Sequence, residues 1–224
     1  MRFKTGSKQD ESIPIILAQS SSTFQLSSGR PRPAALAMTD WAMIDNNNAI
    51  VLPQYWMDAN DAPTVHFSVQ GHRYRDELAG HLLYEMRFKK CRPWLHAISA
   101  QRVDNVIKVK MSEEISIDVD YVTDPGDLGI CYRVNGTAAD IEDISINGNM
   151  INISLSDNTP TNGSLYIGAH GAKKYSDYSN RDGLGRIFGI RSCLRSQHMY
   201  WSHTTGRPLW KWAAIQHIFV SNDM

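Results

Sequence analysis

Two short apolar runs, separated by a helical pattern, constrain most strongly what this chain can fold into. Residues 13–18 and residues 49–52 are almost continuously apolar and end in polar or breaker residues, which is typical of strands buried on both faces of a parallel sheet. Residues 34–45 between them predict a helix with one apolar face, formed by Ala37, Trp41 and Ile44. A second helix is predicted over residues 70–90, where apolar residues recur at a spacing of four: Tyr74, Leu78, Leu82 and Met86. The order strand, helix, strand, helix predicts a parallel sheet covered by helices.

Length and charge narrow the class of protein. The 224 residues suffice for one large domain or for two domains of roughly 100 residues each. Lysine plus arginine and aspartate plus glutamate both number 23, so the formal net charge is zero, which argues against a nucleic-acid binder and against electrostatic docking to a membrane. No run approaches the roughly 18 apolar residues of a membrane span, and the N-terminus lacks the apolar segment of a signal peptide. We therefore expect a soluble protein.

The cysteines and histidines predict neither a disulfide framework nor a metal site. Cys91, Cys131 and Cys193 are odd in number and widely spaced, so we expect buried free thiols. The histidines include no His-x-x-x-His pair, so we expect no metal and no other cofactor.

A polar loop between the second apolar run and the second helix carries an acid, Asp61, and an imidazole, His66. Ser68 to Gly71 then predicts a helix start, which would fix the position of the loop. An acid beside a histidine suits the base of a hydrolase and the group that orients it. The alternative is that both are ordinary loop residues with local hydrogen bonds. The serine-rich loop at Ser20, Ser21 and Ser22 is expected at the same edge of the sheet.

After residue 94 the pattern changes to short alternating runs. Strands are predicted over residues 106–111, 115–120, 128–134, 141–146, 150–155, 164–167 and 210–220, with turn residues such as Asn147-Gly148-Asn149 between several of them. Short strands at nearly regular spacing predict an antiparallel β-sandwich. We therefore expect one region over residues 1–94 and a β-sandwich over residues 95–224, the latter a carbohydrate-binding or assembly module.

Several segments resemble known esterases. Residues 65–73 (Val-His-Phe-Ser-Val-Gln-Gly-His-Arg) resemble the last conserved block of the SGNH (GDSL-like) hydrolases, and residues 15–19 and 50–55 resemble the two units before it. Residues 189–196 and 206–212 resemble the β-sandwich that follows such domains in some bacteriophage tail-associated esterases. The resemblance covers most of the chain. It implies an α/β + all-β fold: a partial flavodoxin-like (SGNH) α/β unit followed by an antiparallel β-sandwich.

In that family a serine attacks an acyl carbon, a histidine takes its proton and an acid orients the histidine. The resemblance implies that His66 is the general base. Pro63 occupies the family's acid position, so Asp61 would have to orient His66, with Asp58 as the weaker candidate. The family's Gly-Asp-Ser nucleophile block and its oxyanion Gly and Asn blocks are absent from the sequence. A nucleophile in the Ser20–Ser22 loop is the remaining possibility within this chain.

The resemblance implies a virion-associated bacteriophage tail protein, similar to the C-terminal part of a serine carbohydrate O-acetylesterase. It would act on or bind host surface glycans, with the nucleophile supplied elsewhere. The alternative is a non-catalytic structural or glycan-binding tail protein. Tyr200 and Trp201, expected in a polar loop, are the candidate glycan contacts, whereas Trp210 and Trp212 are expected in the sandwich core. Unpaired sheet edges predict association with another polypeptide or with further copies, and trimers are common among tail fibres.

Overall fold

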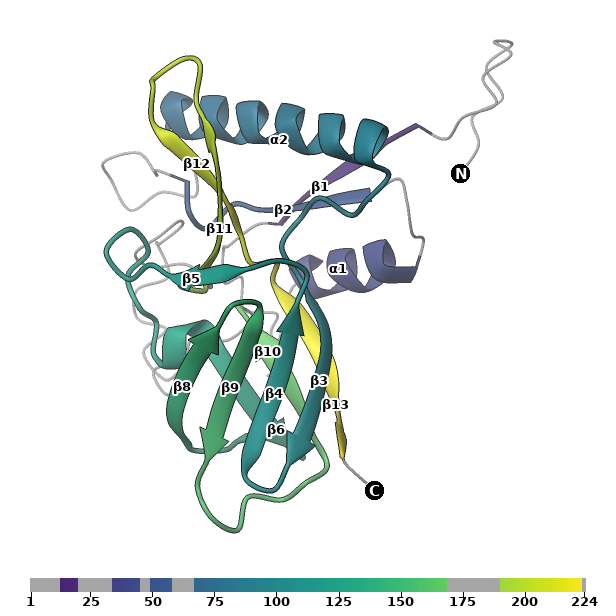
Figure 1. The fold of residues 1–224 in the computed structure, drawn as a ribbon, viewed down its shortest axis with the longest axis vertical. Coiled ribbons are helices and arrows are strands. Elements are labelled where there is room, and N and C mark those ends of the chain that lie inside the picture. The colour runs from purple at the N-terminus through teal and green to yellow at the C-terminus, as the bar shows by residue number, and fades with distance from the viewer. Residues whose placement is uncertain (1–12, 20–33, 45–48, 58–66, 169–189, 223–224) are drawn as a thin grey trace.

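The computed structural model describes residues 13–19, 34–44, 49–57, 67–168 and 190–222 (Figure 1). In chain order the elements are β1 (Ile15–Gln19), α1 (Ala34–Ile44), β2 (Ala49–Pro53), α2 (Val69–Lys89), β3 (Ala97–Val103), β4 (Val106–Met111), β5 (Ile115–Ile117), a 3-10 helix (Asp127–Gly129), β6 (Ile130–Val134), β7 (Thr137–Ala138), β8 (Ile141–Asn147), β9 (Met150–Leu155), β10 (Gly163–Ile167), β11 (Leu194–Trp201), β12 (Pro208–Trp212) and β13 (Gln216–Asn222).

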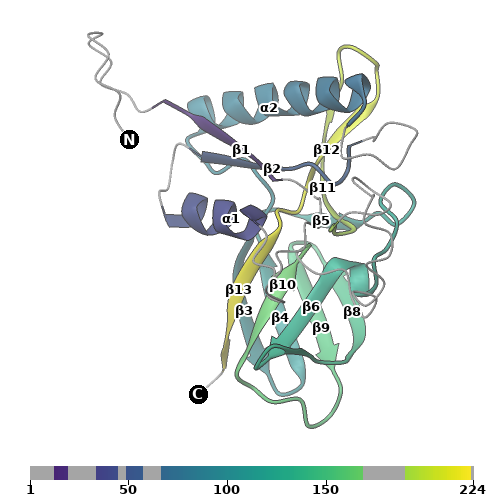
Figure 2. The ribbon, with the colours of Figure 1, turned by 180° about the vertical axis from the view of Figure 1, so that it is seen from behind.

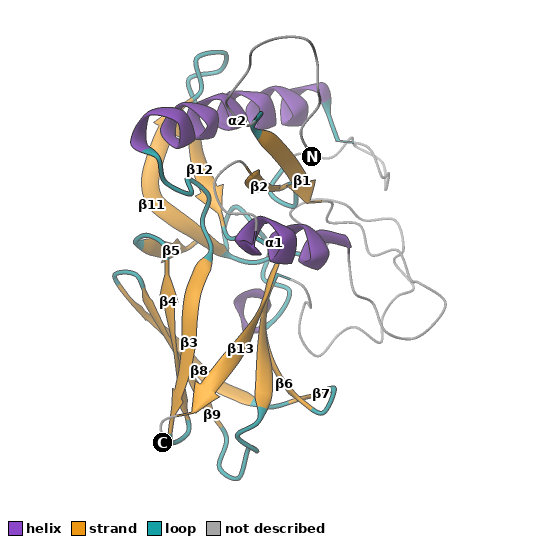
Figure 3. Cartoon of the chain, turned by 90° about the vertical axis from the view of Figure 1, so that its right-hand side faces the viewer, coloured by secondary structure: helices purple, strands orange, loops and turns teal. Residues whose placement is uncertain are grey.

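The first two strands form a small parallel sheet. Ile15 of β1 lies opposite Ala49 of β2, and the register continues to Gln19 opposite Pro53. Helices α1 and α2 lie on opposite faces of this sheet, and Figure 3 shows the three layers from the side. β2 is buried along its whole length, whereas the first two residues of β1 are exposed.

Local sequence sets both ends of α2. The hydroxyl of Ser68 accepts a hydrogen bond from the backbone N–H of Gly71 at 2.9 Å, which satisfies one of the free amides at the helix start. Lys90, in the left-handed conformation with φ 51°, ends the helix. The apolar residues at the predicted spacing of four are buried: Tyr74, Leu78, Leu82 and Met86. The sequence prediction of α2 is therefore confirmed.

An eight-stranded sheet, in the order β7-β6-β10-β13-β3-β4-β9-β8, makes up the lower half of the molecule. It curls, so that β8, β9 and β4 form a front layer and β6 and β10 lie behind them (Figures 1 and 2). Buried side chains such as Ile107, Ile153 and Leu165 form its core. The packing is close at Gly163, where a Cβ atom would overlap the ring of Tyr132.

A third sheet, in the order β12-β11-β5, connects the two halves. The β11–β12 hairpin extends upward to α2 (Figure 1). Its residues Leu209 and Trp212 belong to the same buried cluster as Leu52 of β2 and Leu78 of α2. One hydrophobic core therefore contains residues from both sides of position 94. The domain boundary expected between residues 94 and 95 stays a prediction.

The buried side chain of Gln19 ties the N-terminal strand to residues near the C-terminus. Its amide nitrogen donates to the carbonyl of Ala35 at 2.7 Å and to the hydroxyl of Thr39 at 2.6 Å. The Thr39 hydroxyl donates to the carbonyl of Ile215 at 2.7 Å, and the N–H of Ile215 donates to the amide oxygen of Gln19 at 2.9 Å. These bonds close a ring among β1, α1 and the segment between β12 and β13.

The predicted fold class is wrong. The described chain is mostly β-structure with two α-helices, and its α/β part is a two-stranded parallel pair rather than a flavodoxin-like unit. The expected antiparallel sandwich is instead one curled sheet in which β13 and β3 run parallel, while β5, β11 and β12 form a separate sheet. Alternation identifies strands but cannot show which strand pairs with which, and this is why the prediction failed.

Two local predictions also need correction. In α1 the buried residues are Ala35, Leu36, Thr39 and Ala42, whereas Trp41 and Ile44 of the predicted apolar face are exposed. The single strand expected over residues 210–220 is divided into β12 and β13, because the chain leaves one sheet after Trp212 and enters another at Gln216. Within the described ranges, no helix is both long enough and apolar enough to span a membrane.

Candidate functional site

The segment that carries Asp61 and His66 lies outside the described residues, and so does Asp58. The residues on both sides of it are fixed by packing. Tyr55, which follows β2, is fully buried, and its hydroxyl donates to the carbonyl of Ala213 at 2.7 Å. The indole N–H of the next residue, Trp56, donates to the carbonyl of Pro53 at 2.7 Å. After the segment, Phe67 packs against the main core and Ser68 caps α2.

A pocket of about 140 Å³ opens beside these fixed residues, and we call it the aromatic pocket. It is lined by Trp56, Tyr74, Tyr121, Arg207, Pro208, Leu209, Trp210 and Trp212. Trp56 lies just before the segment with Asp61 and His66, and Tyr74 lies in the second turn of α2 after it. The residues on either side of the segment with Asp61 and His66 in sequence therefore form two walls of the pocket.

Ring-to-ring contacts hold the aromatic walls in place. Tyr121 stacks on Trp212 with ring centroids 5.6 Å apart, and Tyr55 meets the same indole edge-on at 6.2 Å. The guanidinium of Arg195 lies over the Trp210 ring, 4.2 Å from its centroid, and is held there by Asp118 at 2.7 Å. Rigid aromatic faces of this kind suit the C–H faces of a sugar ring. At about 140 Å³ the pocket is smaller than the roughly 300–1,000 Å³ of typical ligand sites, so it fits one ring-sized group.

Two polar groups of the pocket have no partner within the described part of the chain. Tyr74 is only 4% exposed, yet its hydroxyl forms no hydrogen bond to another described residue. The guanidinium of Arg207 is exposed and forms no ion pair or hydrogen bond there either. Both groups are therefore available to a ligand.

The predicted glycan contacts, Tyr200 and Trp201, lie at the end of β11 rather than in a loop. The Tyr200 ring stacks on His81 of α2 with centroids 4.5 Å apart, and the edge of the ring meets His198. Tyr200 therefore packs between the hairpin and α2, whereas Trp201 is 57% exposed. Neither residue lines the aromatic pocket.

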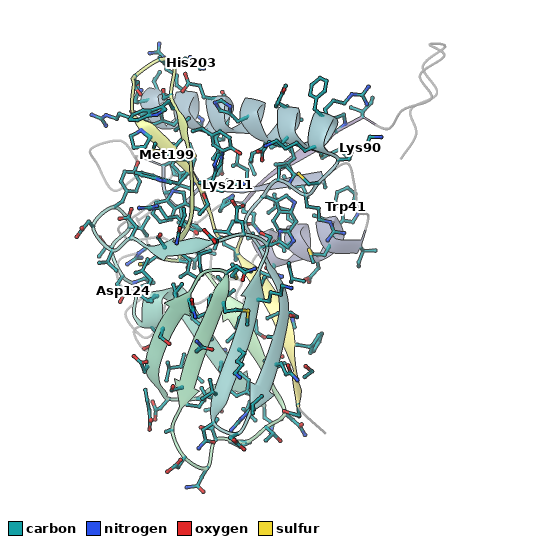
Figure 4. The ribbon with its side chains drawn as sticks, in the orientation of Figure 1. Trp41, Lys90, Asp124, Met199, His203 and Lys211 are labelled. Atoms are coloured by element: carbon teal, nitrogen blue, oxygen red, sulfur yellow. The ribbon has the colours of Figure 1, made fainter. Side chains whose placement is uncertain are left out.

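A buried ion cluster lies beneath the same helix. Lys211 of β12, labelled in Figure 4 below α2, has its ammonium 2.8 Å from Glu113 and 3.7 Å from Glu85. Burial, together with the nearby negative charge of Glu85, raises the pKa of the Glu113 carboxyl. Burial alone would also raise the pKa of Glu85, but the hydrogen bond from Lys89 at 2.6 Å and the charge of Lys211 lower it below its usual value. Opposite charges thus join α2 to the hairpin.

Burial raises the pKa of the Tyr200 phenol well above its usual range, and the carboxylates of Glu85 and Glu113 add to the shift. Tyr200 therefore stays neutral and serves as a packing residue between the hairpin and α2. His81, His198 and His203 gather around this hairpin, with His203 at its tip (Figure 4), but their contacts are between rings. Among the described residues, no group of three histidine, cysteine or acidic side chains could hold a metal ion.

The aromatic pocket thus brings together residues that the sequence did not predict to lie in one site. Trp210 and Trp212, expected in the core, both line the pocket, although Trp212 is also buried. Trp56, Tyr74, Tyr121 and Arg207 were missed. A tryptophan three residues after the carboxyl end of a buried strand, as at Trp56, was a usable signal. The Ser20–Ser22 loop lies outside the described residues, directly after the buried Gln19.

The sequence matches no protein-family model and no curated protein, but the fold is similar to that of a solved acetylesterase structure. A carbohydrate acetylesterase from Xanthomonas citri shares 10% identity with this chain at a TM-score of 0.50. The similarity covers 91% of this chain and 40% of that chain, so the chain spans less than half the length of the acetylesterase. The N-terminal part of a bacterial S-layer protein matches at 8% identity and a TM-score of 0.30, over 69% of this chain and 29% of that one. At 10% identity the likeness to the acetylesterase is one of fold alone.

Proposed function

We propose that this chain is the sugar-binding and base-carrying part of a carbohydrate O-acetylesterase, with the nucleophile supplied by another polypeptide. In this proposal His66 is the general base, Asp61 orients it, and the aromatic pocket holds the sugar whose acetyl ester is hydrolysed. The observation that carries the proposal is the aromatic pocket, since two of its walls flank the segment with Asp61 and His66. The fold likeness to a carbohydrate acetylesterase supports the choice of substrate class.

The nucleophile would arrive with a strand that pairs with β1. Within the described residues β1 pairs with β2 alone, and Ile15 and Ile16 on it are 43% and 40% exposed. Parallel strands are usually buried on both faces and continue into larger sheets, so this edge favours an added strand. The resemblance of residues 189–196 and 206–212 to tail-associated esterases extends the proposal to a bacteriophage virion and a host surface glycan.

A binding protein without catalysis is the second candidate. The described residues that line the pocket include no serine, histidine, aspartate or glutamate, so the pocket on its own offers contacts but no acid–base chemistry. In that case the chain would hold a host glycan while another protein, or none, performs chemistry on it.

Acetate release from O-acetylated oligosaccharides separates the two candidates. The chain is assayed alone and together with the proteins encoded next to it, as wild type, as His66→Ala and as the matched control His72→Ala on the exposed face of α2. The enzymatic proposal expects acetate release in the mixture, its loss in His66→Ala and its retention in His72→Ala. Sugar binding without acetate release in any mixture would support the binding protein instead. A chain that neither releases acetate nor binds the sugar would overturn both.

A further inference from the structure

The charge at the aromatic pocket restricts which sugar it can prefer. Of the eight described residues that line it, Arg207 is the one that carries a formal charge at neutral pH. Arg195 lies nearby over Trp210, but its charge is offset by Asp118 at 2.7 Å. The guanidinium of Arg207 has no such partner within the described residues. Among the described residues, the mouth of the pocket therefore presents one positive charge without an acidic partner.

The backbone that carries Arg207 is held in place by several bonds. The carbonyl of Arg207 accepts from the N–H of Ser202 at 2.8 Å, and the N–H of Gly206 donates to the carbonyl of Ser202 at 2.8 Å. Gly206 has φ +64°, a conformation that glycine adopts without strain. The neighbouring Thr204 donates its N–H to Glu77 of α2 at 2.9 Å, so the turn is tied to the helix that supplies Tyr74. The guanidinium thus projects from a preorganised turn beside the pocket.

We infer that the aromatic pocket selects a sugar that bears a carboxylate, such as a hexuronic or sialic acid; this rests on the proposed function of the pocket as a sugar site. A guanidinium presents parallel N–H donors that match the two oxygens of a carboxylate, and such charge-assisted bonds are about twice as strong as neutral ones. The partly exposed rings of Trp210 and Tyr121 supply the apolar contact with the sugar. The hydroxyl of Tyr74, a pocket residue without a hydrogen-bond partner in the described chain, can donate to a ring substituent.

Two ligands that differ only in the carboxylate test the inference. Binding of methyl β-glucuronide and of methyl β-glucoside to the full chain is measured by calorimetry, while the tryptophan indole N–H signals are followed by NMR. The wild type is expected to bind the glucuronide about tenfold more tightly than the glucoside, and this preference should shrink as salt is added. Arg207→Gln should bind both sugars with the affinity of the glucoside, and Arg207→Lys should retain part of the preference. Arg73→Gln, at an exposed arginine of α2 outside the pocket, is the matched control and should behave as wild type.

Failure of the inference and failure of the proposed function give different results. Equal affinities of the wild type for the two sugars, with the Trp210 signal shifted by both, would overturn the preference for acidic sugars and leave the pocket as a sugar site. A preference that survives Arg207→Gln would overturn the role of Arg207. If neither sugar binds, the proposed sugar site itself is overturned.

Discussion

Replacing Gln19 with alanine removes the hydrogen-bonded ring that joins β1, α1 and the segment before β13. The side chain is fully buried, so water does not reach the groups that it satisfies in the folded protein. The N–H of Ile215 loses its acceptor, and an unsatisfied buried donor costs about 1–3 kcal/mol. The carbonyl of Ala35 and the hydroxyl of Thr39 also lose a donor. A total loss of about 3 kcal/mol in the free energy of unfolding follows, which for a chain of this size lowers Tm by about 6–12 °C.

Thermal and urea unfolding of Gln19→Ala measure this loss. Ser99→Ala, at an exposed serine of β3, is the control and should change Tm little. In the double variant Gln19→Ala/Thr39→Val the two effects should not add, because the Thr39 hydroxyl receives a bond from Gln19 and passes one to Ile215. A Gln19→Ala protein as stable as Ser99→Ala, or strictly additive effects in the double variant, would refute the network.

Three further predictions concern stability. Burial and the nearby charge of Arg92 lower the pKa of His96 below 6.5, so the unfolded chain binds more protons than the folded chain just below that pH. The free energy of unfolding should therefore fall as pH drops through 6.5 toward the pKa of His96 in the folded protein. The fall in Tm over this range should be smaller in His96→Asn than in the wild type. Equal profiles of Tm against pH for the two proteins would contradict this. Gly163→Ala should lower the free energy of unfolding by about 1–3 kcal/mol, because the added methyl group overpacks against Tyr132. Gly80→Ala, in open space on α2, should raise it by about 0.5–1 kcal/mol. Similar urea midpoints for the two variants would contradict the close packing at Gly163. Lys211→Met should lower the free energy of unfolding by about 3 kcal/mol, because Glu85 and Glu113 lose the buried ammonium between them. An unchanged urea midpoint would show that this ion cluster does not stabilise the fold.

Elements with strong local signals could be predicted from the sequence. The spacing of four and the Ser68 cap identified α2 almost to the residue, and the turn at Gly148 correctly separated β8 from β9. The strand β3 was missed because an irregularity between Ala97 and Ser99 breaks its alternation. The strand β11 has a similar irregularity between Arg195 and Met199, so its polar and aromatic residues suggested a loop.

The arrangement of these elements could not be predicted, because it depends on contacts between distant parts of the chain. The parallel pairing of β13 with β3 joins Val220 to Ala100 and has no local signature. The face of α1 was misjudged because Thr39, a polar residue, is buried for its hydrogen bonds to Gln19 and Ile215. The aromatic pocket brings Trp56 beside Trp210, and no spacing rule connects residues so far apart in sequence.

The proposed function requires above all that the aromatic pocket binds a sugar. The most direct test is a titration of the full chain with an O-acetylated sugar, observed through the indole N–H signals of its six tryptophans. We predict from this proposal that the signals of Trp210 and Trp212 shift, whereas those of Trp41 on α1 and of Trp94, buried in a separate cluster, do not. Shifts confined to the exposed Trp201, or no shift of Trp210 and Trp212 at saturating sugar, would contradict it.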